Sequence, residues 1–353
     1  MESLSSIASH LSPRKVRREL LSGPARWLRR LRPGATILCY HRVAALDRDP
    51  QLLAVSPRRF AEQLDVLRRR HHIARLSEWL AEPGPRHRRS IILTFDDGYA
   101  DNLHEALPLL RAADCPATMF VASGKIGDET EFWWDELERL LLSPASLPKI
   151  LSLTIGGRNY AWRLNSQSDE VQAGGNWNVL LAQEPSPRQT AYLALCALLP
   201  TADAAERSEI LAKMRRWAAL SRAGRPSHRP LSRSELCDLS SDALIEIGAH
   251  SVNHSSLAAL PVDAQRFEIG ESKAALERLI GKPVTTFSYP FGTRADYSAE
   301  TIRLVREAGF ACARANHPAT AFRGGERYAM PCFVVRDWDG DEFAKRLAAW
   351  NAA

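Results

Sequence analysis

The stretch Ile91-Ile92-Leu93-Thr94-Phe95-Asp96-Asp97-Gly98-Tyr99 decides the fold. Its apolar and β-branched residues predict a strand that is buried on both faces, as in a parallel sheet. Two carboxylates follow at its carboxyl end, and Gly98 permits a sharp turn there. Because adjacent strand residues point to opposite faces, Asp96 and Asp97 have different surroundings unless the chain leaves the extended state. A plain turn with a helix N-cap remains an alternative for this motif alone.

A second buried strand is predicted over 243–249, and it runs into His250-Ser251-Val252-Asn253-His254. If this segment is helical, the two histidines share a face with the spacing at which helical histidines hold one metal ion. An ordinary polar loop is the alternative. Two imidazoles and one carboxylate of the Asp pair form a facial set that leaves positions open for water and substrate, and this set suits zinc, cobalt or iron(II). The other Asp is then free to move protons.

Three motifs resemble those of the polysaccharide deacetylases, the carbohydrate esterases that share the nodulation-factor deacetylase homology domain. Residues 94–99 resemble the first signature motif and residues 250–254 the second. Residues 287–292, Phe-Ser-Tyr-Pro-Phe-Gly, resemble the motif beside the family's metal. The strand Ile37-Leu38-Cys39-Tyr40-His41-Arg42-Val43 resembles the opening strand of the subgroup found with bacterial surface-polysaccharide enzymes. The likeness covers about 36–124 and 236–348.

The resemblance implies an α/β fold, a distorted (β/α)7 barrel, and a divalent metal held by Asp97, His250 and His254. Zinc is the expected ion, with cobalt, nickel and iron as alternatives. Asp96 stands at the position of the family's catalytic base, and the backbone N–H of Phe291 stands at that of its oxyanion donor. The implied activity is hydrolytic removal of the acetyl group from an N-acetylated sugar or polysaccharide precursor, in exopolysaccharide biosynthesis.

Two positions depart from the family pattern. The usual third motif begins with an arginine that orients the base, and Ser288 stands there instead. No Leu-x-His motif supplies the general acid, for which we rank His317 slightly ahead of His41. Two alternatives therefore stay open: a catalytically weakened, carbohydrate-binding member of the fold, and an amidase acting on a small nucleotide- or lipid-linked sugar.

Substrate contacts are expected from aromatic and ring side chains around the motifs. Three of them lie inside the motifs, namely Tyr99, Tyr289 and Pro290. Trp133 is a further candidate because an exposed tryptophan stacks on sugar rings, although a tryptophan pair at a helix start also serves as a packing anchor. His41, at the end of an early strand, either lines the mouth of the site or is a structural core histidine.

The alternation of strands and helices is interrupted in the middle of the chain. We expect a basic N-terminal segment over 1–33, the first part of the barrel over 34–124, an inserted subdomain over 125–235 and the second part of the barrel over 236–353. The insertion is predicted to mix a hairpin at Gly156-Gly157 with several helices. Five of the nine tryptophans fall within it, which makes it the expected place of substrate selection.

Charge is concentrated at the N-terminus. Residues 1–33 hold eight basic and two acidic side chains, a net charge of +6 that equals the net charge of the whole 353-residue chain. The rest is therefore close to neutral, which argues against a nucleic-acid-binding body. Leucines and Trp27 among the arginines of 14–32 predict an amphipathic helix, with peripheral contact to an anionic membrane as one function and a tail or a helix laid on the barrel as the alternative.

The predicted location is the cytoplasm. No apolar run reaches the length of a membrane span, and charges interrupt the N-terminus too often for a signal peptide. The six scattered cysteines show no metal-binding spacing and are expected to be free thiols in a reducing compartment.

Overall fold

The computed structural model describes residues 34–352 except 82–88, 145, 165–176 and 182–183. Its largest sheet has nine strands, and the main path runs β11-β10-β9-β6-β5-β1-β12. All pairings in it are parallel except that of β12 with β1. The strands are β1 Gly34–Tyr40, β4 His72–Ile73, β5 Arg89–Phe95, β6 Ala117–Val121, β9 Ile245–Ala249, β10 Thr286–Ser288, β11 Cys312–Arg314, β12 Ala321–Phe322 and β13 Phe333–Val334.

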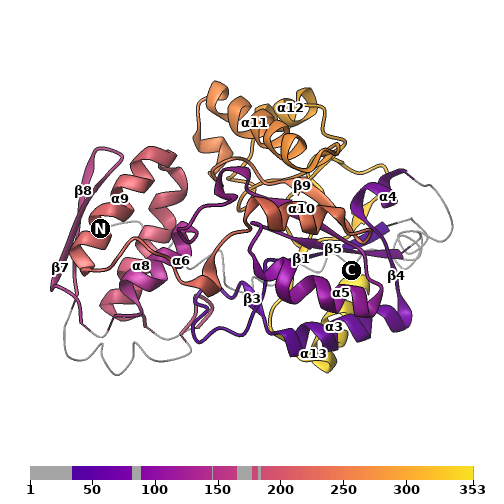
Figure 1. The fold of residues 1–353 in the computed structure, drawn as a ribbon, viewed down its shortest axis with the longest axis horizontal. Coiled ribbons are helices and arrows are strands. Elements are labelled where there is room, and N and C mark those ends of the chain that lie inside the picture. The colour runs from indigo at the N-terminus through magenta and orange to yellow at the C-terminus, as the bar shows by residue number, and fades with distance from the viewer. Residues whose placement is uncertain (1–33, 82–88, 145, 165–176, 182–183, 353) are drawn as a thin grey trace, which may run out of the picture.

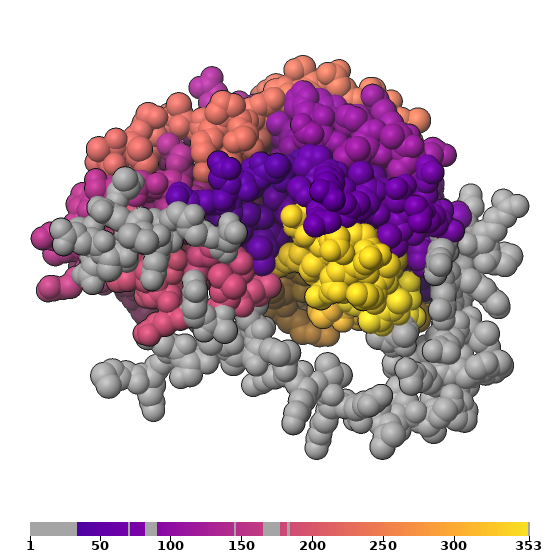
Figure 2. All heavy atoms as spheres, turned by 90° about the horizontal axis from the view of Figure 1, so that it is seen from below, coloured from indigo at the N-terminus to yellow at the C-terminus, as the bar shows by residue number. Residues whose placement is uncertain are grey.

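Helices cover the sheet on both faces (Figure 1). They are α3 Pro57–Arg70, α4 Leu76–Ala81, α5 Leu107–Ala113, α10 Arg233–Ser241, α11 Val262–Ile280, α12 Ala299–Glu307 and α13 Gly340–Ala352. The last helix lies against α3, and Figure 2 shows the yellow C-terminal segment next to indigo parts of the chain. Phe343 and Leu347 of this helix join Phe60 and Leu64 in one buried core. The predicted α/β class and distorted barrel are confirmed, because the curled, mainly parallel sheet has the architecture of the deacetylase barrel.

The strand that opened the sequence argument lies in the middle of the sheet. β5 pairs in register with β1 on one side and β6 on the other, which explains why its apolar residues are buried on both faces. The chain then turns sharply, because Asp97 and Gly98 have φ values of 75° and 87°. A Cβ at Gly98 would lie 2.8 Å from Cγ1 of Val121, so glycine is required both for its conformation and for the space.

Between β6 and α10 the chain forms a separate group of elements with its own hydrophobic core. They are α6 Trp133–Leu141, β7 Ile150–Ile155, β8 Arg158–Arg163, α8 Pro187–Leu198 and α9 Ala204–Ala218. β7 and β8 form the predicted antiparallel hairpin around Gly156-Gly157. This group lies at one end of the molecule in Figure 1. The division of the chain into four segments stays a prediction, and its first segment, 1–33, lies outside the described residues.

Two local segments differ from regular helices. Residues 177–181 form a turn. The carboxylate of Asp101 does not cap the helix that follows, because it accepts from Arg42 and from the N–H of Val43. A π-helical turn, Asn102–Ala106, follows and leads into α5. It directs the amide of Asn102 to the carbonyl of His41, at a distance of 2.9 Å.

The described helices include none with both the length and the apolar character needed to cross a membrane.

Candidate active site

Side chains from three strand ends meet at the carboxyl edge of the sheet. Asp96 and Asp97 follow β5, His250 follows β9, and His41 follows β1. Parallel pairing places these ends at one edge, which is where open α/β sheets bind their ligands. Asp96, Asp97 and His250 have exposed fractions of 5%, 2% and 1%, so they interact in a poorly solvated environment.

Asp97, His250 and His254 form a compact group of three donors. Oδ1 of Asp97 lies 3.3 Å from Nε2 of His254 and 3.6 Å from Nε2 of His250. Both distances exceed the 2.7–2.9 Å or so of a charge-assisted hydrogen bond. They are close to the separation of about 3.3 Å between donors that share a tetrahedral ion with bonds of about 2.0–2.1 Å. The donor set therefore fits a divalent cation such as zinc.

Hydrogen bonding and burial prepare these imidazoles as neutral ligands. Nδ1 of His250 donates to the carbonyl of Ser288 at 2.8 Å, which leaves the lone pair of Nε2 facing Asp97. Burial lowers the pKa of His250 to about 4, and burial together with the charge of Arg207 lowers that of His254 to about 4. Burial also raises the pKa of Asp97, so a cation between the three groups would favour its charged form.

Of the two conformations considered for residues 250–254, a helix and a polar loop, the structure has the loop. In it Ser251 and His254 have positive φ values of 59° and 51°. The loop is held from α11, where the carboxylate of Glu268 accepts the N–H groups of Val252 and Asn253 at 2.9 and 2.8 Å. The histidines therefore converge through a clamped loop, and not through helical spacing.

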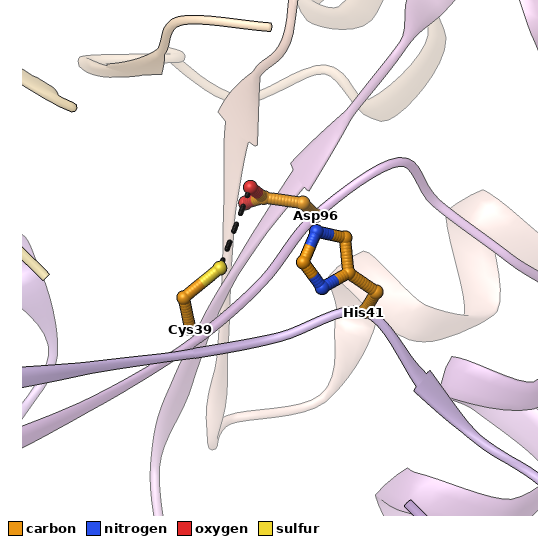
Figure 3. Close-up of side chains that lie close together, drawn as sticks. All are labelled: Cys39, His41 and Asp96. Carbon is orange, nitrogen blue, oxygen red and sulfur yellow. Dashed lines mark hydrogen bonds between the residues drawn. The ribbon is translucent and has the colours of Figure 1, made fainter. Parts of the chain in front are cut away.

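Asp96 stays apart from this group. One of its oxygens, Oδ2, accepts from Arg314 and lies 3.6 Å from the thiol of Cys39 (Figure 3). The other, Oδ1, is buried without a hydrogen-bond partner among the described residues. Burial alone would raise the pKa of Asp96, but the charge of Arg314, followed by those of His250 and His41, lowers it to about 2. Asp96 is therefore ionised and keeps one oxygen free to accept a proton.

The two candidate acids lie in different places. His41 is grouped with Asp96 and Cys39, their donor atoms all within 4.8 Å of one another, and Figure 3 shows its ring beside the carboxylate. His317 lines a cavity of 610 Å³ together with Arg294 and Tyr297. None of the Asp and His residues at the carboxyl edge lines that cavity. The geometry therefore favours His41 over His317.

Phe291 turns beside the histidines with a φ of 59°. Its ring centroid is 4.7 Å from that of His254, and its N–H has no partner in the described part of the chain. Trp133 packs 6.4 Å from Phe291 with its indole nitrogen buried and unpaired among the described residues. Trp134 lies 4.7 Å from His254, so α6 supplies an aromatic wall.

Two predicted substrate contacts are wrong, and a third motif residue is buried. Tyr99 is fully buried, and its hydroxyl donates to Asp135 at 2.6 Å. Tyr289 is also buried, and its hydroxyl donates to the carbonyl of Tyr328 at 2.9 Å. Pro290, likewise buried, contributes through its backbone, because its carbonyl accepts the N–H of Gly292 at 2.6 Å. These motif residues therefore support the site through buried contacts and do not offer a surface to substrate.

Sequence reasoning missed two residues that support the site, Arg314 and Glu268. For Arg314 a signal existed, because an arginine stands inside the predicted apolar strand Phe310-Ala-Cys-Ala-Arg-Ala315. A charge within a buried strand is costly unless it is paired, so it points to an acidic partner. Glu268 carries no comparable signal, since a glutamate on an amphipathic helix usually faces water.

The fold and the site define an α/β-barrel enzyme with an Asp-His-His metal-type cluster and a separate carboxylate beside it. The sequence model of the family described as Polysaccharide deacetylase matches residues 84–147 and 224–313, which contain all three motifs. Over these two segments the chain is similar to the polysaccharide deacetylases, which are carbohydrate N-deacetylases.

Individual relatives are distant. The Bacillus subtilis protein YxkH, whose name places it among the polysaccharide deacetylases, is 28% identical over 86 residues, a match that spans 24% of this chain and 30% of YxkH. The Streptococcus pyogenes deacetylase PplD, solved with acetate, has a TM-score of 0.54 at 14% identity and covers 89% of this chain and 98% of its own. IcaB from Ammonifex degensii has a TM-score of 0.52 at 18% identity, with 91% and 98% covered. These similarities support the barrel fold.

Proposed function

We propose that this protein is a metal-dependent hydrolase that removes the acetyl group from an N-acetylated saccharide. The observation that carries the proposal is the pairing of two functions at one sheet edge. Asp97, His250 and His254 offer three donors to one cation, while Asp96 beside them remains uncoordinated and ionised. The match to the polysaccharide deacetylase family model agrees with this reaction.

Each residue of the site has its own role in the hydrolysis of the amide. When bound, a divalent cation at the three donors lowers the pKa of a coordinated water and polarises the acetyl carbonyl. Asp96 takes a proton from the water as the water's oxygen bonds to the acetyl carbon. The N–H of Phe291 donates to the acetyl oxygen while negative charge accumulates on it. Breaking of the carbon–nitrogen bond then yields acetate and a free amine.

The departing nitrogen needs a proton, and His41 is the candidate that lies close enough to deliver it. Burial lowers the pKa of His41, whereas the charges of Asp97 and Asp96 raise it. The π-helical turn supports this position, because Asn102 holds the carbonyl of His41. His317 lies among the residues of another cavity and is not needed for this step.

The proposed substrate is an N-acetylated saccharide of a surface polysaccharide. Support comes from Phe291, which is partly exposed beside the histidines, since aromatic faces stack on sugar rings. Trp133 and Trp134 are buried and pack next to it. Cytoplasmic location and membrane contact through 14–32 stay predictions, and residues 14–32 lie outside the described residues. An amidase acting on small nucleotide- or lipid-linked sugars differs from this proposal only in substrate size.

Two neighbouring substitutions test the proposal. Asp96→Asn should keep the metal and lower kcat for acetate release by about 100-fold or more, the range of a lost general base. Asp97→Asn should lose the metal and with it the activity. Both are assayed for bound metal and for acetate from N-acetylhexosamine oligomers, nucleotide sugars and lipid-linked sugars. Normal turnover by Asp96→Asn would show that Asp96 is not the general base. A wild-type protein that binds a glycan but releases no acetate would show that the protein is not a deacetylase.

A further inference from the structure

A buried arginine binds the carboxylate of Asp96, the proposed base. Arg314 on β11 is 1% exposed, and one of its terminal nitrogens, Nη2, donates to Oδ2 of Asp96. The same nitrogen donates to Oγ of Ser288 at 2.6 Å, and Nη1 donates to Sγ of Cys332 at 2.8 Å. Burying a guanidinium is costly unless it is paired, so these contacts define one orientation of its planar fork.

Strand register explains how this arginine reaches the base. Ser288 on β10 and Arg314 on β11 are Cα partners in the parallel pairing of the two strands. Partners in adjacent parallel strands point to the same face of the sheet. The side chain of Arg314 therefore passes the short side chain of Ser288 and meets the carboxylate that follows β5. A small residue at 288 leaves space for this path.

The two carboxylate oxygens of Asp96 have different contacts. Oδ2 is occupied by Arg314 and approached by Cys39, whereas Oδ1 has no partner among the described residues. A carboxylate fixed through one oxygen presents the other in a single direction. Such fixation matters for proton transfer, because a misplacement of about 1 Å can reduce a rate by about 100-fold.

We propose that Arg314 is the positioning residue of the base, acting from β11 in place of an arginine at position 288. This inference rests on the proposed deacetylase function. Arg314 acts through Asp96 and does not touch substrate. The guanidinium and the hydroxyl of Ser288 form one unit across two strands, so the two residues should be exchangeable between positions.

The test is an exchange of the two side chains. Arg314→Ser should lower kcat by about 100-fold, with a small change in KM and an unchanged metal content. The double variant Ser288→Arg/Arg314→Ser should recover at least 10-fold of that loss, because the guanidinium returns to the same space. Guanidinium ion added to Arg314→Ser should restore part of the rate. Arg303→Ser, an exposed arginine on α12, is the control and should keep wild-type kcat.

Crystal structures of the same variants give a readout that does not depend on turnover. The carboxylate of Asp96 should rotate in Arg314→Ser and return in the double variant. If Arg314→Ser does not fold, Arg314→Lys takes its place and should leave the carboxylate misaligned, since an ammonium cannot make the forked contacts. Full activity or an unmoved carboxylate in the folded single variant overturns the inference, as does a double variant no better than the single one. A wild-type protein without activity refutes the proposed function alone, and the carboxylate orientation still decides the role of Arg314.

Discussion

Asp96 and Asp97 are adjacent in sequence, but their carboxylates have different surroundings and different roles. Asp96 donates no ligand to the Asp-His-His group and is kept ionised by Arg314, with a pKa of about 2. Burial raises the pKa of Asp97, so a cation nearby would favour its charged form. The positive φ of Asp97 allows this separation, because it turns the second carboxylate away from the path of the strand.

The two histidine candidates for the acid lead to a first prediction at this scale. His41→Gln should lower kcat by about 100-fold or more, since a general acid contributes at least that much to amide hydrolysis. His317→Gln should stay close to the wild type because His317 lines the separate cavity. Steady-state acetate release at saturating substrate measures both. If His317→Gln lowered kcat and His41→Gln did not, His317 would be the general acid.

A second prediction concerns pH and the metal-free protein. The folded-state pKa values of His250 and His254 are about 4, below the 6.5 or so of an unfolded histidine. The unfolded chain therefore binds more protons between these values, and stability should fall as the pH is lowered from about 6.5 to about 4. Each imidazole contributes at most about 3 kcal/mol. Burial raises the pKa values of Asp97 and Asp135, and these carboxylates oppose the trend. The contribution of the two imidazoles is therefore read from the difference between the wild type and a variant that lacks them.

Urea unfolding in the presence of a chelator, followed across this pH range, measures the effect. The double variant His250→Gln/His254→Gln is the matched control and should show a shallower dependence. The same pH dependence in the metal-free wild type and in the double variant would mean that the imidazoles are not held neutral by burial.

At the scale of elements, the metal-type cluster depends on a helix that contributes no ligand. Glu268 of α11 is 5% exposed and accepts three hydrogen bonds from the loop over 250–254, two from backbone N–H groups and one from the amide of Asn253 at 2.6 Å. Arg207 of α9 donates to the carbonyl of Asn253 at 2.7 Å. The loop is thus fixed from the barrel on one side and from the group between β6 and α10 on the other.

The prediction for this element is a loss of metal affinity. Glu268→Gln replaces a carboxylate acceptor with an amide that satisfies fewer of these donors, and it should weaken metal binding by about 10- to 100-fold, as outer-shell changes typically do. Titration of the metal-free protein with zinc measures the dissociation constant. Glu271→Gln on the same helix, where Glu271 pairs with exposed Arg278, is the control and should bind as the wild type does. Equal affinities would show that the loop holds its shape unaided.

Elements were predictable where the information is local. β5, β9 and α11 follow from apolar runs and from the capping position of Gly281, whose φ is 65°. The contact between Arg314 and Asp96 was not predictable, because it depends on which residues become partners across β10 and β11. The spacing of His250 and His254 did not decide between a helix and a loop. Side chains at i and i+4 meet in a helix, but in this loop positive φ values bring the two imidazoles together.

On the scale of the whole molecule, a bound cation would connect distant parts of the chain. Its donors follow β5 and β9, which are separated in sequence by the whole group from α6 to α9. Because a ligand that binds only the folded state stabilises it, zinc at 100 times its dissociation constant should add about 2.7 kcal/mol. We expect a rise of a few degrees in Tm, measured by scanning calorimetry. Asp97→Asn should abolish the rise, and an equal rise in that variant would place the ion elsewhere.

The group between β6 and α10 departs from the barrel and rejoins it at one point. The N–H of Gly127 donates to the carbonyl of Leu231 at 2.8 Å, and the N–H of Leu231 donates to the carbonyl of Gly98 beside the Asp pair. Two chain ends that are joined by a single hydrogen bond need no long linker. The intervening segment therefore begins and ends at neighbouring points of the barrel, next to the Asp pair. Changes of length between these two points leave the strand ends of the barrel in place, whereas Arg207, which holds the carbonyl of Asn253, must be kept for the loop over 250–254 to stay fixed.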